Sequence, residues 1–258
     1  MVKSMPTQKI AKIADRIQAG RNNIVFTGAG ISTESGIPDY RSQGGIWDKF
    51  RPVYFDEFMS SRESREEYWR RWVELYEGLA KAEPNPAHMA VAELCQAGLV
   101  QTVITQNIDG LHQASGVSPD RIIELHGNTR RIRCMHCRKV SSTDKVRQRL
   151  ANGDTAPQCS CGGYLKPDTI SFGQAMPAAE VERAVTLSQA SDFFMVVGST
   201  LLVQPAAHMP FYAKNNGAWL AIVNLSATPC DNICDVRVQA AAGKVLPAIV
   251  AQVKKDGS

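Results

Sequence analysis

Residues 27–32, which read Thr-Gly-Ala-Gly-Ile-Ser, have the composition of a phosphate-binding turn. They follow an apolar run at residues 23–27 that predicts a buried strand. Glycines at positions 28 and 30 would let the backbone approach an anion closely, with its N–H groups facing it. The signal is incomplete, because Thr33 stands where the common dinucleotide fingerprint has its third glycine, and no acidic ribose ligand is evident after a second strand. A plain strand-to-helix turn remains the alternative.

Polar side chains follow two further predicted strands. Asn107 and Asp109 flank Ile108 just after the strand expected at residues 100–106, and ligands of open α/β sheets bind at such carboxyl ends. The alternative is a turn that uses Asn and Asp for local hydrogen bonds. His126 follows Ile-Ile-Glu-Leu at the expected edge of the sheet. Histidine suits general-base chemistry because its ordinary pKa, about 6.5, lies near working pH.

Four of the seven cysteines form two tight pairs, Cys134/Cys137 and Cys159/Cys161. We find no export signal, and in such a protein paired cysteines predict metal ligands before disulfides. Four thiolates from two short loops are typical of one tetrahedral Zn²⁺ ion with no open position, so we expect a structural rather than a catalytic metal.

Several blocks of sequence resemble the sirtuins, the NAD-dependent protein lysine deacylases. Residues 28–42 read Gly-Ala-Gly-Ile-Ser-Thr-Glu-Ser-Gly-Ile-Pro-Asp-Tyr-Arg-Ser, like the family's opening signature. Later blocks follow in the family's order: Thr-Gln-Asn-Ile-Asp-Gly-Leu-His at 105–112, Glu-Leu-His-Gly at 124–127, the cysteine pairs, Leu-Lys-Pro-Asp-Thr-Ile-Ser-Phe-Gly-Gln at 165–174, Gly-Ser-Thr-Leu-Leu-Val-Gln-Pro at 198–205 and Ile-Val-Asn-Leu at 222–225. The resemblance spans about residues 9–250, nearly the whole chain.

The resemblance implies an enzyme that removes an acyl group, by default acetyl, from lysine and gives nicotinamide, acyl-ADP-ribose and free lysine. It implies Asn107 and His126 as catalytic residues, with His126 the base that activates a ribose hydroxyl after nicotinamide leaves. The alternative with the same chemistry is protein ADP-ribosyl transfer or NAD hydrolysis. An inert NAD-binding domain carrying a zinc-ribbon interaction module is a third hypothesis, but it has no need of both Asn107 and His126.

The resemblance also implies the other site residues. NAD would be bound by Gly28, Ala29, Gly30, Ile31, Asp39, Tyr40, Arg41, Gln106, Asn107, Ile108, Asp109, Gly198, Ser199, Thr200, Asn224, Leu225 and Ala242. Within that set, Asp39, Tyr40 and Arg41 belong to a loop expected to close over the cofactor, where Arg41 can pair with a phosphate or its ribose. Zn²⁺ would be bound by Cys134, Cys137, Cys159 and Cys161, although the family's second pair is normally Cys-x-x-Cys, which leaves His136 as a substitute ligand.

Acylated proteins would bind as an added strand between Phe172-Gly173 and Val203. Lys166 and Gln174 replace a common arginine and a common glutamate of the family here. For the acyl group, Tyr68 and Arg71 lie one helical turn apart and resemble an acid-reading pair. A different alignment puts Trp72 and Leu75 at those positions, and a core aromatic stripe with a solvated charged face is the remaining alternative.

Alternating strands and helices must position these residues. Strands are expected at 23–27, 100–106, 193–198, 219–224 and 235–239, and helices at 9–18, 61–80, 86–98, 177–190, 205–215 and 244–254. This alternation predicts an α/β, doubly wound (Rossmann-like) fold with a mainly parallel sheet. We expect an NAD-binding domain from residues 1–47, 91–128 and 166–258, and a small domain from a helical module, 48–90, and a zinc module, 129–165.

Composition limits the other classes of function. The net charge of +4 is too small to favour direct nucleic-acid binding. The longest apolar runs are far shorter than the roughly 20 residues of a membrane helix, so no membrane partner is expected. We expect a cytoplasmic protein.

Overall fold

The larger sheet has six parallel strands in the order β3-β2-β1-β7-β8-β9. The computed structural model describes residues 6–39 and 51–256. The strands are β1 (Asn23–Thr27), β2 (Thr102–Thr105), β3 (Ile122–Glu124), β7 (Phe193–Val197), β8 (Trp219–Val223) and β9 (Val236–Val238). The winding direction reverses between β2 and β7 on either side of β1, and ligands of such sheets bind at this switch point. The predicted doubly wound parallel sheet is confirmed.

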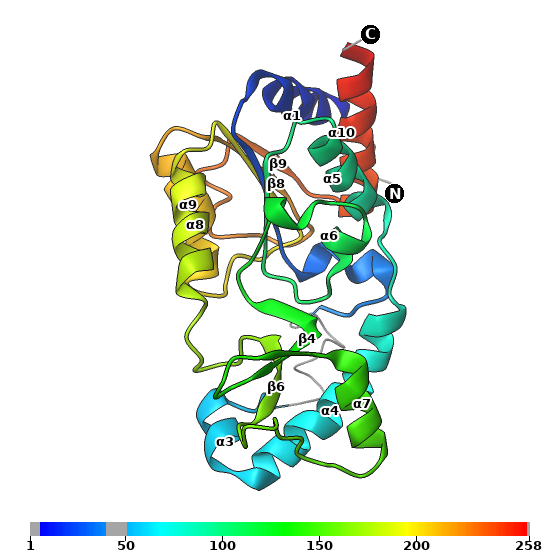
Figure 1. Ribbon diagram of the computed structural model, residues 1–258. Helices are drawn as coiled ribbons and strands as arrows, with labels where there is room; N and C mark the ends of the chain where they lie inside the picture. The colour runs from blue at the N-terminus through cyan, green and yellow to red at the C-terminus, as the bar shows by residue number, and fades with distance from the viewer. Residues whose placement is uncertain (1–5, 40–50, 257–258) are drawn as a thin grey trace.

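Helices cover both faces of this sheet (Figure 1). One core is formed with α1 (Thr7–Ala19), α5 (Pro86–Gln96) and α10 (Ala242–Asp256), and the other with α8 (Ala178–Gln189), η4 (Ala206–His208) and α9 (Met209–Asn215). The alternation of side chains along a strand explains the two cores: Val25 of β1 faces the first, and Ile24 and Phe26 face the second. Every residue of β1 and β7 is therefore buried.

A second, smaller sheet lies beyond the carboxyl ends of the parallel strands (Figure 1). It is antiparallel, in the order β5-β4-β6, from β4 (Gly127–Cys134), β5 (Val140–Ser142) and β6 (Leu165–Thr169). It packs with α7 (Thr143–Ala151) and α4 (Arg62–Lys81), while α3 (Phe55–Ser60) precedes α4. The remaining short elements are η1 (Ala29–Ile31), η2 (Thr33–Ser35), α6 (Leu111–Ala114) and η3 (Pro119–Arg121).

The aromatic stripe of α4 packs on this small sheet. Trp69, Trp72 and Tyr76 form a core with Ile132 of β4 and Leu165 of β6. The Trp72 and Tyr76 rings stack with centroids 4.4 Å apart. The helical and zinc segments thus share one hydrophobic core.

The predicted domain boundaries after residues 90, 128 and 165 fall inside α5, β4 and β6 respectively. The division into domains remains a prediction. Among the described helices, none has the length and apolar character needed to cross a membrane.

Candidate active site and zinc site

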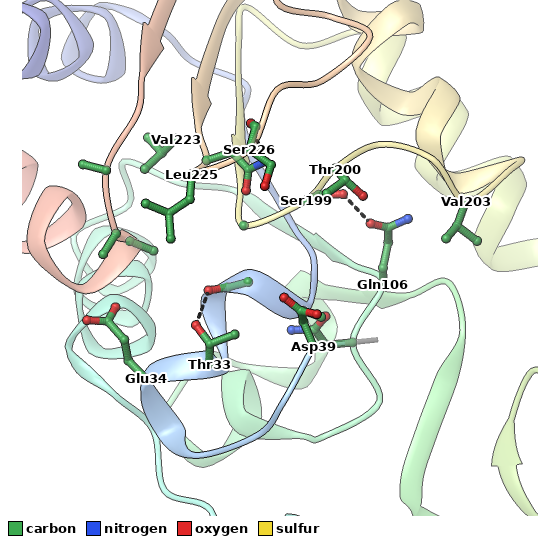
Figure 2. Close-up of a pocket in the computed structure, with 18 of the residues that line it drawn as sticks. Thr33, Glu34, Asp39, Gln106, Ser199, Thr200, Val203, Val223, Leu225 and Ser226 are labelled. Carbon is green, nitrogen blue, oxygen red and sulfur yellow. Dashed lines mark hydrogen bonds between the residues drawn. The ribbon is translucent and has the colours of Figure 1, made fainter. Parts of the chain in front are cut away.

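A cavity of about 280 Å³ opens at the carboxyl ends of β1, β2, β7 and β8 (Figure 2). It gathers most of the residues predicted to bind the cofactor: Ala29, Gly30, Asp39, Gln106, Asn107, Gly198, Ser199, Thr200, Asn224, Leu225 and Ala242, together with His126. Thr33, Glu34 and Ser226 also line it and were not predicted. The cavity therefore lies at the switch point of the sheet, and its lining is mainly hydroxyls, amides and small residues.

Other predicted residues lie behind this cavity or elsewhere. Ile31 is fully buried in the core beneath it, and Ile108 lines a second cavity. Tyr40 and Arg41 lie outside the described residues. A Cβ atom at Gly28 would lie 2.8 Å from the Ser199 Cβ, so this glycine lets the turns after β1 and β7 touch. Close approach of two protein loops thus explains Gly28 in this structure.

His126 connects the two sheets, because it lies between the end of β3 and the start of β4. Its Nδ1 lies 2.9 Å from the carbonyl oxygen of Gln106. A carbonyl only accepts, so Nδ1–H donates and the neutral ring keeps its lone pair on Nε2. Burial lowers the pKa of His126 below 6.5, and the hydrogen bond to Gln106 offsets part of this effect. The ring is therefore neutral, as a base must be, at neutral pH.

A buried hydrogen-bond network holds Asn107 at the cavity floor. The Asn107 side-chain amide donates to the Ser32 hydroxyl at 3.1 Å, and that hydroxyl donates to the Asp109 carboxylate at 2.8 Å. Asp109 is 5% exposed and does not line the cavity. It fixes Ser32 directly, and through Ser32 it also fixes Asn107. Sequence reasoning missed Ser32, although it belongs to the glycine-rich block.

Two histidines lie beneath this network. His88 and His112 are almost completely buried, with rings 5.2 Å apart in an edge-on arrangement. His112 Nε2 lies 2.9 Å from the Thr27 hydroxyl, and its Nδ1 is buried without a hydrogen-bond partner in the described chain. Burial lowers the pKa of His112 to about 3. Burial also lowers the pKa of His88 below 6.5, so both rings are neutral at neutral pH.

A second cavity, of about 600 Å³, lies on the other side of His126. His126, Gln106 and Val203 line both cavities. The second one contains all the predicted substrate residues, Tyr68, Arg71, Phe172, Gly173 and Val203, and also Trp72 and Leu75 from the alternative alignment. Most of its wall is apolar, including Ile37, Pro38, Val53, Leu79, Ile108, Ile170 and Met176.

Several polar side chains in or beside this second cavity contact protein atoms. The Arg71 guanidinium Nε donates to Glu67 at 2.6 Å. Hydrogen bonds from Arg70 and Arg71 lower the pKa of Glu67 to about 2, so Glu67 is ionised and pairs with both guanidinium groups. The Tyr68 hydroxyl lies 3.4 Å from that of Thr169. Lys166 is fully buried with Nζ 5.4 Å from the Tyr68 ring centroid, so it supports Tyr68 from behind.

The four paired cysteines come together at the end of the small sheet. Their sulfur atoms all lie within 4.8 Å of one another, with Cys134 and Cys161 at 3.6 Å and Cys137 and Cys159 at 3.8 Å. Zn–S bonds of about 2.3 Å in a tetrahedron require sulfur atoms about 3.8 Å apart. The tight Cys-Ser-Cys pair therefore fits one structural Zn²⁺ ion, and His136 is not part of the cluster.

Comparison with known proteins gives consistent matches. A profile of the Sir2 family matches residues 28–205. An NAD-dependent protein deacetylase 1 of Bradyrhizobium diazoefficiens is 47% identical over 93% of this chain and 95% of its own length. A structure described under the mechanism and regulation of Sir2 enzymes superposes with a TM-score of 0.85 at 40% identity, covering 96% and 98% of the two chains. A Sir2 structure with a p53 peptide and NAD⁺ gives a TM-score of 0.83 at 34% identity, covering 95% and 97%.

Proposed function

Because the chain belongs to the Sir2 family, we propose that it is an NAD-dependent protein lysine deacylase with acetyl-lysine as its default substrate. The observation that supports this proposal most directly is the position of His126 in a wall shared by two cavities. One cavity is the more polar of the two and lies at the switch point of the sheet, as a dinucleotide site does. The other is apolar and suits an acylated side chain.

The residues of the first cavity fit NAD. Hydroxyls of Ser199 and Thr200 and the amide of Asn224 follow β7 and β8, while the turn after β1 brings small residues to the same place. When bound, NAD supplies the ribose carbon that accepts the acyl oxygen. Asn107, held by Ser32, would orient the nicotinamide-ribose end of NAD. His126 Nε2 accepts the proton of a ribose hydroxyl, and the Gln106 carbonyl stabilises the resulting imidazolium.

Peptide substrates bind along Phe172, Gly173 and Val203 in our proposal. These residues line the second cavity, and Phe172 is 39% exposed. A peptide added as a strand is recognised mainly through its main chain, which suits an enzyme with several protein substrates. The acyl group then enters the apolar part of the cavity beside Tyr68 and Arg71.

The alternative reactions, ADP-ribosyl transfer and NAD hydrolysis, do not need the second cavity. The names of the relatives favour deacylation. A cytoplasmic location is part of our proposal. It is supported by the seven cysteines, which are all free and four of which are clustered for metal binding, as a reducing compartment allows.

Product analysis tests the proposal. Purified protein is incubated with NAD and an acetyl-lysine peptide, and the products are identified by mass spectrometry. We expect equal amounts of free-lysine peptide, nicotinamide and acetyl-ADP-ribose. ADP-ribose without loss of the acetyl group would instead establish NAD hydrolysis, and an ADP-ribosylated peptide would establish transfer.

A further inference from the structure

Glu34 connects the turn after β1 to the start of α10. It lies in η2 at the exposed rim of the first cavity. Its Oε2 accepts a hydrogen bond of 2.7 Å from the backbone N–H of Gly243, the second residue of α10. A Cβ atom at position 243 would lie 2.4 Å from that oxygen, so the contact requires glycine there. The carboxylate is thus fixed in place, and it neutralises the positive end of the helix.

Glu34 lies at the end of the cavity away from Gln106, whose carbonyl oxygen contacts His126. Figure 2 shows Gln106 and Val203 on one side and Glu34 on the other, with Leu225 above Glu34. Ser226 and the alanines at 240–242 line the cavity as well. If the reacting ribose lies beside His126, as the proposed function requires, the adenosine half of NAD extends toward Glu34.

The charges around this cavity are acidic. Apart from His126, the ionisable residues that line it within the described ranges are Glu34 and Asp39, and the described lining includes no lysine or arginine. Arg237, beside Ser226, pairs with Asp231 at 2.9 Å and donates to the Ser226 carbonyl. Within the described lining, an additional phosphate on the adenosine ribose would therefore meet a carboxylate and no cation.

Dinucleotide-binding folds commonly place a carboxylate on the adenosine ribose, from the end of the second strand, and this contact favours NAD over NADP. Here the acidic residue that follows the second strand, Asp109, is buried and does not line the cavity. We propose that Glu34 supplies this carboxylate from the first turn. Its Oε1, which takes part in no hydrogen bond within the described chain, accepts from the ribose 2′-hydroxyl, while its charge repels a 2′-phosphate. Glu34 is thereby a specificity-determining residue for NAD against NADP, an inference that rests on the proposed function.

The test compares the binding of NAD and NADP by calorimetry, and kcat/KM with an acetyl peptide, in the wild type and Glu34→Gln. The amide oxygen of glutamine still accepts from Gly243, so this variant removes charge while keeping the helix cap. We expect the NAD-to-NADP affinity ratio to fall about tenfold, the size of one lost charged hydrogen bond. Glu34→Lys should shift the ratio further in the same direction.

Asp15→Asn is the matched control, because it removes an exposed charge from α1, outside the cavity. It should leave the ratio unchanged. A ratio that is the same in Glu34→Gln and the wild type, with NAD still bound by both, would overturn the inference and leave the proposed function intact. Absence of NAD binding to the wild type would instead contradict the proposed function itself.

Discussion

At the scale of single residues, the site depends on where protons and charges are held. His126 has one ring nitrogen committed to the Gln106 carbonyl, which leaves the other to accept a proton. Asn107 is held by Ser32, and Ser32 by Asp109. The groups proposed to react are therefore oriented by buried hydrogen bonds before any ligand binds.

The pH dependence of activity should report on His126. Burial lowers its pKa, so the neutral base persists to more acidic pH than an exposed histidine would allow. We expect the acid limb of kcat/KM for deacylation to have an apparent pKa below 6.5. A limb above 6.5 would contradict this assignment.

His126→Ala should lower kcat by about 10²-fold to 10⁴-fold and keep NAD binding, as measured by calorimetry.

At the scale of elements, α4 contributes to both the hydrophobic core of the small sheet and the wall of the second cavity. Its aromatic residues pack on the small sheet, while Tyr68, Arg71 and Leu75 line the second cavity. The described arginines that line this cavity, Arg51 and Arg71, are paired with Glu57 and Glu67, and most of the wall is apolar. The cavity therefore suits neutral acyl groups better than acidic ones. An acidic-acyl preference would contradict this account of α4.

Gly78 of α4 allows a direct test of the acyl pocket. It lines the second cavity, and a Cβ atom there would meet no atom within 4 Å. Replacing a helix glycine also favours the helix, by up to about 1 kcal/mol. We expect Gly78→Phe to lower kcat/KM for long acyl chains at least about tenfold and to change that for acetyl little. Glu77→Phe, on the exposed face, is the control. Equal effects on all acyl lengths would refute the assignment of the cavity.

At the scale of the whole molecule, the buried His112 makes the unfolding free energy depend on pH. In the unfolded chain His112 takes up a proton near pH 6.5, whereas in the folded protein its pKa is about 3. The unfolded state thus binds more protons below pH 6.5, and the folded state is destabilised as pH falls toward 3. Between pH 6.5 and 3, we expect this group to lower the unfolding free energy by about 1.4 kcal/mol for each pH unit.

Denaturant unfolding at several pH values measures this loss. His112→Gln should flatten the slope between pH 6.5 and 4, because glutamine does not titrate. An unchanged slope in the variant would show that His112 does not govern the acid sensitivity of the fold.

The parallel sheet could be predicted from the sequence because its strands are short apolar runs followed by polar residues, as at Thr27 and Thr105. The small sheet was harder to predict, since β4 and α7 are rich in charged residues and their apolar faces are narrow. The contact between Glu34 and Gly243 joins residues 209 positions apart, so no local pattern could indicate it. The second cavity likewise combines residues of α4 with the loops after β6 and β7, which are far apart in the sequence.

The central claim is that nicotinamide leaves NAD only when an acylated lysine occupies the second cavity. Multiple-turnover nicotinamide release should be measured with a panel of acyl-lysine peptides and without peptide, for the wild type and His126→Ala. We predict release that requires an acyl peptide and falls at least about 100-fold in the variant. Release at the same rate without peptide would contradict the account and identify an NAD hydrolase.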